Sequence, residues 1–361
     1  TLVPVTGKKF KWRKKKKHAT LKKCFERIGG IEMKQRIPEI DVLRGLGIVF
    51  VLLGHAIIVY PINLHSIPIF QFVFNIVSSV HIYLLFLLAG FCYRKKADYL
   101  EYLRGKVKHI MIPYSIFSMV DMVPRALLIT FVNRPADFME SIRRILFYGG
   151  EYWFLYVLFM IYIIVPFVSS ASTGIQKQEI VVFIMALILG VSAVFVDMPE
   201  ILRIDSISRC FVFFYAGFLV KKCWQSCMYL YGTLVNRKKV SAILFGILWI
   251  GIVVLAQMTE EAEWIFLIAT VVGILFWVQV VGCLKNSPIG NVLQKCGQRS
   301  LQLYLFNGFL LVISRTLIIN VLEIRNPWII VGANMVFTLG GSMLIIEILS
   351  KNKLGRFILG E

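Results

Sequence analysis

The sequence predicts an all-α fold, a polytopic transmembrane bundle of about ten helices with both termini on the cytoplasmic side. The first observation behind this prediction is composition, because 58% of the 361 residues are hydrophobic and only 17% are charged. A soluble protein of this length needs a larger charged fraction to cover its surface. The other two observations are a series of long apolar runs and an uneven distribution of lysine and arginine.

Ten apolar runs divide the chain into candidate spans. Runs that can cross a hydrocarbon core of about 30 Å occupy residues 42–60, 69–93, 110–132, 152–171, 180–196, 240–257, 264–284, 300–319 and 328–350. A tenth run, 207–220, is short for a span.

Lysine and arginine fall mainly on one side of this series. Alternate segments, counted from the N-terminus, hold 31 of these residues, whereas the intervening loops hold 5. Positive residues concentrate in cytoplasmic loops, so the pattern predicts an even number of spans with both ends inside. The predicted organisation is a basic N-terminal segment, 1–36, expected to be disordered, a membrane domain, 37–350, and a short basic tail, 351–361.

The basic N-terminal segment allows two kinds of partner, lipid or nucleic acid. Residues 1–32 carry eleven Lys/Arg and two Glu, and a basic segment before a membrane helix typically lies against anionic headgroups. We therefore expect membrane lipids, and no nucleic acid, beside it. Met33 is a candidate start of the natural chain, in which case 1–32 is an extension.

The seven cysteines do not predict a metal site. Cys223 and Cys227 are four residues apart, but no His or Cys pair completes a ligand set. Most cysteines lie in or near segments placed in the cytosol, so we expect reduced thiols, no bound metal and no bound cofactor.

The first apolar helix carries the most informative polar residues. A charged side chain within hydrocarbon needs a partner, a water-filled cavity or a function. Arg44 and His55 are eleven residues apart, which places them on one helix face with a rise of roughly 16 Å between them. Gly45, Gly47 and Gly54 permit close approach of another backbone or a ligand.

Each member of this pair also has a structural explanation. Arg44 can extend to the headgroups and pair with Asp41 one turn earlier, and His55 can be a hydrogen-bonded core histidine. Their common face beside small residues favours a site.

These two residues and five later blocks resemble the acyltransferase-3 family of integral-membrane acyltransferases. The family has an Arg, ten intervening residues and a His on its first helix, as at Arg44 and His55. The later blocks follow in the family's order: 81–91 (HIYLLFLLAGF), 112–114 (IPY), 152–158 (YWFLYVL), Arg209 with 213–217 (FFYAG), and 300–306 (SLQLYLF). Family members often carry His where this chain has Asn307, which cannot become a cation near neutral pH.

The resemblance implies a membrane O-acyltransferase. Such an enzyme moves an acyl group, commonly acetyl, from cytosolic acyl-CoA (acetyl-CoA) to a hydroxyl of a carbohydrate or lipid-linked glycan acceptor. The implied process is O-acetylation, a polysaccharide modification in the cell envelope, and the implied location is the bacterial cytoplasmic membrane, as a multi-pass protein.

The chemistry assigns different roles to the two first-helix residues. His55 is the only residue of this helix of a type able to titrate near neutral pH, and it is expected to remove the acceptor's proton; acyl transfer onto its imidazole is the less favoured variant. Arg44 is expected to hold a phosphate or carbonyl oxygen of the donor.

Four further residues are candidates for substrate or donor binding, each with a structural alternative. His81 lines the same cavity as His55 or is a structural histidine. Arg209 contacts a phosphate or anchors its helix at the interface. Trp153 belongs to a block that is more often packing than site, and Asn307 can orient a partner by hydrogen bonding.

Two other function classes stay open at this point. A secondary transporter or flippase of a polar or lipid-linked solute also needs polar groups at mid-membrane, although the sequence lacks a convincing pair of matched broken segments. A non-catalytic membrane partner with the same fold is the third. Release of CoA from labelled acyl-CoA by the purified protein distinguishes the enzyme from both.

Overall fold

The computed structural model describes residues 37–58, 63–127, 138–172, 174–224, 238–259, 262–284 and 286–361. Across these residues every regular element is a helix, and eight helical stretches are long and apolar enough to cross a membrane. The all-α polytopic bundle predicted from the sequence is therefore confirmed. Its orientation stays a prediction from the charge distribution.

Helices occupy all ten predicted runs. In chain order the elements are α2 (Pro38–Ile58), η1 (Leu64–Ser66), α3 (Pro68–Ser78), α4 (His81–Cys92), α5 (Tyr99–Lys106), η2 (Val107–Met111), α6 (Ile112–Leu127), α7 (Phe138–Tyr148), η3 (Gly150–Tyr152), α8 (Trp153–Val168), α9 (Lys177–Phe195), η4 (Ile201–Arg203), α10 (Ile204–Lys222), α12 (Lys238–Met258), α13 (Ala262–Leu284), α14 (Pro288–Gln298), α15 (Ser300–Thr316), η5 (Leu317–Val321), α16 (Pro327–Leu349) and α17 (Lys353–Ile358). The short run at 207–220 lies within the 19 residues of α10. The last part of the third run, 128–132, and the N-terminal segment 1–36 lie outside the described residues.

Polar caps set the start of several helices. At α16, Asn326 accepts hydrogen bonds from the backbone N–H groups of Trp328 (3.0 Å) and Ile329 (3.4 Å), and Pro327 occupies the first helical position. Ser287 caps α14 in the same way, ahead of a proline. These residues satisfy or remove N–H groups that have no partner within the helix.

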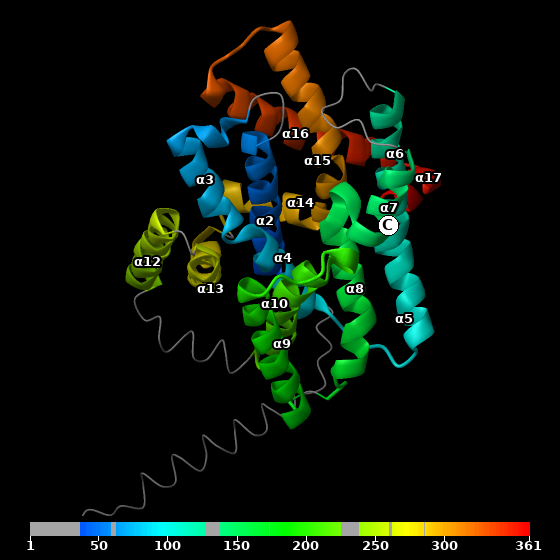
Figure 1. Ribbon diagram of the computed structural model, residues 1–361, viewed down its shortest axis with the longest axis vertical. Helices are drawn as coiled ribbons and strands as arrows, with labels where there is room; N and C mark the ends of the chain where they lie inside the picture. The colour runs from blue at the N-terminus through cyan, green and yellow to red at the C-terminus, as the bar shows by residue number, and fades with distance from the viewer. Residues whose placement is uncertain are drawn as a thin grey trace, which may run out of the picture. The chain divides into compact units, whose positions relative to one another are not determined.

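Helix α2 is the central element of the bundle. It is buried over 78% of its most apolar window, against at most 44% for the other candidate spans. It contacts α3, α4, α13, α14, α15 and α16 (Figure 1). By contrast, α9 and α12 expose large apolar side chains, among them Ile184, Ile188, Ile243 and Ile247, as expected for lipid-facing helices.

Helix α14 crosses the first half of α2 at very short range. A Cβ atom on Gly45 would overlap the carbonyl oxygen of Leu293, and one on Gly297 would overlap that of Asp41. Glycine at both positions therefore lets the two backbones touch. The close approach that the sequence predicts at Gly45 is confirmed.

The second predicted span is broken at Ser79 and Val80, so that α4 starts at His81. The Ser79 carbonyl accepts a hydrogen bond from the Thr270 hydroxyl (2.6 Å), and the Ser79 hydroxyl accepts one from Trp249 Nε1 (3.1 Å). The Thr270 hydroxyl satisfies the Ser79 carbonyl at the break, which the bilayer could not do. The break places His81 at a helix start.

The C-terminal segment packs into the bundle. Leu359 is fully buried in a cluster that includes Ile48 and Leu303, and the Gly360 carbonyl accepts a hydrogen bond from His109 Nδ1 (2.5 Å). The segment 351–361, predicted as a short basic tail, thus contains α17 and contacts the core.

Candidate functional site

One cavity brings together four of the six residues that the sequence singles out. It has a volume of ≈ 380 Å³ and is lined by His55, His81, Trp153 and Arg209. Small-molecule sites commonly measure roughly 300–1,000 Å³. The remaining lining residues are Val51, Gly54, Ile58, Phe74, Ser78, Ile82, Tyr83, Asp205, Ser206 and Cys210.

His55 lies in the last turn of α2 and is exposed to this cavity, while the adjacent Gly54 and Ala56 are buried. The fully buried Arg315 of α15 donates a hydrogen bond to the Ala56 carbonyl. Carbonyl groups at a helix C-terminus have no partner within the helix and attract cations. Arg315 therefore holds the turn that carries His55.

His81, the other histidine of this cavity, has a defined ring orientation. His81 Nδ1 lies 2.7 Å from the Val77 carbonyl oxygen. Because a carbonyl only accepts, Nδ1 must carry the proton, which leaves Nε2 as the acceptor of the neutral ring.

Arg209 lines the cavity, but the partners of its guanidinium lie outside it. Its Nη1 forms an ion pair with Glu263 Oε2 (3.0 Å), and its Nη2 donates to the Ala193 carbonyl (2.8 Å). The charge distribution predicts that Glu263 is in an outer loop. These contacts match the interface-anchor alternative for Arg209, at the end of the bundle opposite to Arg44.

Arg44 does not line the cavity. It interacts electrostatically with Tyr162 of α8, and the ammonium of Lys106 lies 3.6 Å from the centre of the same ring. Asp41 accepts a hydrogen bond from Gln298 (3.4 Å), and among the described residues no ion pair joins it to Arg44. The structure thus separates Arg44 from His55, as their spacing along α2 requires.

Asn307 also lies away from the cavity. It is 4% exposed within α15, and its Oδ1 has no hydrogen-bond partner among the described residues. An unsatisfied buried amide oxygen is costly. The structure does not bring it together with His55.

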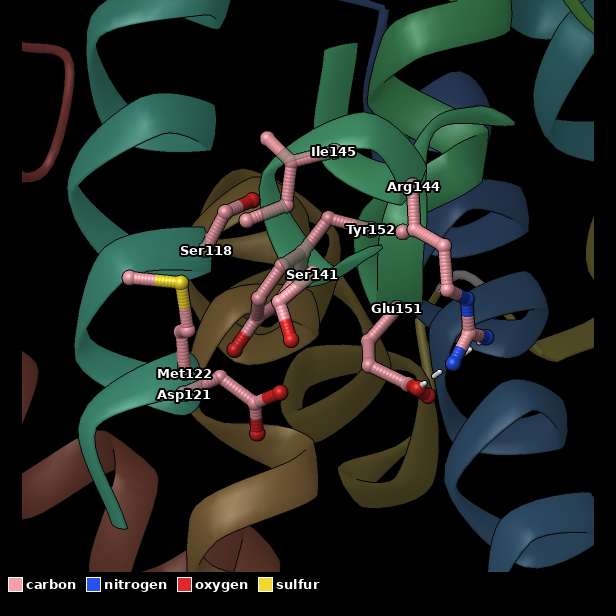
Figure 2. A pocket seen from close by; sticks show the side chains of 9 residues that line it. Ser118, Asp121, Met122, Ser141, Arg144, Ile145, Glu151 and Tyr152 are labelled. Carbon is pink, nitrogen blue, oxygen red and sulfur yellow. Dashed lines mark ion pairs between the residues drawn. The ribbon is translucent and has the colours of Figure 1, made fainter. Parts of the chain in front are cut away.

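A second, smaller cavity of ≈ 40 Å³ lies beside η3. Figure 2 shows Asp121, Ser141 and Tyr152 directing oxygen atoms toward the same space. Glu151 forms an ion pair with Arg144 (3.9 Å).

Three further polar residues near these cavities lie outside the motifs and are not among the residues predicted from the sequence. Asp205 lies four residues before Arg209 on α10, a spacing that puts both on one face. Glu151 directly precedes the block with Trp153, and Arg203 stacks 5.0 Å from the Trp153 ring. The i, i+4 spacing could have indicated Asp205, whereas the placement of Glu151 and Arg203 depends on the tertiary fold.

The main cavity combines two imidazoles, a guanidinium and aromatic surface. Such a set can move protons and bind a polar ligand, since imidazole exchanges protons near neutral pH. Within the described part of the chain, no group of three His, Cys, Asp or Glu is arranged to hold a metal ion.

The acyltransferase-3 family model, described as an acyltransferase domain, matches residues 37–347. The match covers most of the chain and runs from α2 almost to the end of α16. Neither a curated protein nor a solved structure matches the chain.

Proposed function

Because the chain belongs to the acyltransferase-3 family and is a multi-pass membrane acyltransferase, we propose that it moves an acyl group from acyl-CoA to a hydroxyl of a carbohydrate-type acceptor. The match confirms the family predicted from the sequence motifs. It also confirms the predicted enzyme class, an acyltransferase that transfers groups other than aminoacyl groups. The identity of the donor, the acceptor and the catalytic residues is the proposal. Acetyl is the acyl group that we propose first.

The observation that carries this proposal is the position of His55. It is exposed on the wall of a ≈ 380 Å³ cavity, next to His81 and Trp153. A general base must lie within hydrogen-bond reach of the proton that it removes. A hydroxyl of an acceptor in this cavity meets that requirement.

In the proposed reaction, the acceptor oxygen attacks the thioester carbonyl carbon of acyl-CoA. A new C–O ester bond forms, and the C–S bond breaks. His55 takes the hydroxyl proton and returns it to the departing sulfur, so that CoA leaves as a thiol. His81 Nε2 can accept a second hydrogen bond from the acceptor and orient it.

Arg44 serves the donor in this proposal. It lies at the predicted cytoplasmic end of α2 and interacts electrostatically with Tyr162 of α8. A guanidinium binds phosphate through two parallel hydrogen bonds. The donor would place its anionic part near Arg44 and extend its acyl arm along the roughly 16 Å of helix to His55.

The predicted orientation puts the His55 cavity nearer the outer side, which suits an acceptor made or displayed at the cell surface. We therefore propose O-acetylation of a polysaccharide or a lipid-linked glycan in the cell envelope. The proposed location is the bacterial cytoplasmic membrane. Trp153 suits a sugar acceptor, because its ring can cover the apolar face of a pyranose.

The test is acyl transfer by the purified full chain in lipid nanodiscs. With [¹⁴C]acetyl-CoA and methyl glucoside as a probe acceptor, we expect CoA release and a labelled ester. Neither CoA release nor label transfer in folded, monodisperse protein would overturn the proposal. Solute movement in proteoliposomes without CoA release would favour a transporter instead.

A further inference from the structure

Asp205 is a charged residue of the His55 cavity to which neither the sequence motifs nor the proposed reaction assigns a role. It lines the same cavity as His55, His81 and Arg209, and it lies in the first turn of α10. The charge distribution predicts that the segment leading into this turn, 197–206, is on the outer side. Asp205 is therefore placed to meet an acceptor that enters the cavity from that side.

The Asp205 carboxylate has few hydrogen-bond donors around it. Its Oδ2 accepts a hydrogen bond from the Ser206 hydroxyl (2.9 Å), whereas its Oδ1 is buried and has no partner among the described residues. A carboxylate has roughly four lone-pair sites, and a buried acceptor that stays unpaired costs free energy. A ligand that donates a hydrogen bond to this carboxylate would remove that cost.

The charge of Asp205 is not balanced by a neighbouring cation either. Arg209 follows four residues later on the same helix face, but its guanidinium forms an ion pair with Glu263 (3.0 Å). Arg203 stacks 5.0 Å from the Trp153 ring. Within the described part of the chain, no ion pair joins Asp205 to a Lys, Arg or His.

Two other polar groups of the cavity wall are unable to donate to a ligand. His81 Nδ1 is directed at the Val77 carbonyl (2.7 Å), so that Nε2 can only accept while the ring is neutral. The Ser78 hydroxyl donates to the Phe74 carbonyl (2.7 Å). A ligand that supplies several donors of its own, as the hydroxyls of a sugar do, therefore matches this wall.

We propose that Asp205 accepts a hydrogen bond from a hydroxyl of the acceptor other than the one that His55 deprotonates, and that its charge makes the cavity selective for neutral over anionic sugars. This inference rests on the proposed function and deepens it, because it names the acceptor class. An acceptor carboxylate beside Asp205 would bring like charges together, which is unfavourable. The cavity volume of ≈ 380 Å³ lies within the usual range of roughly 300–1,000 Å³ for small-molecule sites.

The test compares two probe acceptors in the purified full chain. Methyl glucoside is neutral, whereas methyl glucuronide carries a carboxylate in place of the hydroxymethyl group. Wild-type protein should have a higher kcat/KM for methyl glucoside. Asp205→Asn should lower the ratio of the two kcat/KM values by roughly tenfold to a hundredfold, as expected for a lost hydrogen bond to a charged group. The change should combine a higher KM for methyl glucoside with a lower KM for methyl glucuronide.

One further variant and one control make the test specific. Asp205→Glu retains the charge and should keep part of the selectivity. The control is Asp197→Asn, which makes the same chemical change at an exposed residue outside the cavity lining, and its ratio should equal that of wild type.

A purely structural role of Asp205 gives a different result. An acidic side chain in the first turn of a helix is stabilised by the helix dipole, and the loss of that effect alone would reduce transfer to both acceptors alike. The ratio of the two kcat/KM values would then stay at the wild-type value.

The outcomes separate this inference from the proposed function. An unchanged ratio in folded Asp205→Asn overturns the role of Asp205 while acyl transfer stands. Equal kcat/KM values in wild type, or a preference for methyl glucuronide, overturn it as well, and they do so without any variant. A preference for methyl glucuronide would assign anion binding to Arg209, whose Nε is also without a partner among the described residues. No transfer to either acceptor by wild type overturns the proposed function itself.

Discussion

A buried ion pair between α9 and α10 gives the sharpest stability prediction. Glu179 Oε1 accepts hydrogen bonds from Lys222 Nζ (2.5 Å) and the Ser170 backbone N–H (2.9 Å), and Oε2 accepts one from the Gln176 backbone N–H (2.9 Å). The two charged side chains are only 1% and 7% exposed. The network therefore joins the start of α9, the end of α10 and the connection between α8 and α9.

Removing one charge leaves the other buried without its partner. Glu179→Gln and Lys222→Met should each lower the free energy of unfolding by about 3–5 kcal/mol, a large part of a typical total of about 5–15 kcal/mol. The double variant should lose much less than the sum, because it buries no uncompensated charge. Glu101→Gln is the matched control: its partner is Lys96 at 3.2 Å, both side chains are more than half exposed, and its loss should be about 0–1 kcal/mol.

The assay is equilibrium unfolding of the four purified variants and wild type in mixed detergent–SDS micelles, followed by tryptophan fluorescence. The prediction is refuted if the free energy of unfolding of either single variant lies within about 1 kcal/mol of the wild-type value, since exposed ion pairs contribute no more than that. Additive losses in the double variant would show that the two charges are not coupled in the folded state.

Three further predictions concern pH, orientation and Asn307. Burial lowers the pKa of Lys106 from 10.5 to about 8, so unfolded protein binds its proton over a range where folded protein does not, and stability should rise with pH from about 8 to 10.5; Lys106→Met should flatten that rise. Single cysteines at Ser66 and Glu323 in a cysteine-free background should react with an impermeant reagent in intact cells, and one at Lys96 should not; the reverse pattern would invert the bundle. Asn307→Leu should lower activity without moving its pH optimum, whereas a shift of more than about a unit in Asn307→His would show that ionisation at this position matters.

The helices were predictable because hydrocarbon imposes strict requirements on length and polarity. All ten apolar runs contain helices. The apolar run in α10 is shorter than the helix itself, because the charged residues Asp205 and Lys222 lie near the two helix ends. The break at Ser79 was not predictable, since its polar groups are satisfied by Trp249 and Thr270 from distant parts of the chain.

Helical spacing and family motifs made part of the site predictable. Motif residues from four helices, His55, His81, Trp153 and Arg209, line one cavity. Arg44 and Asn307 do not. The spacing of Arg44 along α2 already implied its separation from His55, whereas the place of Asn307 depends on how α15 packs, which no local pattern encodes.

The most direct test of the central claim is a paired measurement on folded, monodisperse His55→Ala and Arg44→Ala. His55→Ala should bind acetyl-CoA with near wild-type affinity while single-turnover transfer falls by roughly 10²–10⁴-fold, because the variant lacks the proposed base. Arg44→Ala should mainly weaken acetyl-CoA binding, with partial recovery in Arg44→Lys. Near-normal transfer by folded His55→Ala would contradict the claim that the His55 cavity is where the acyl group is transferred.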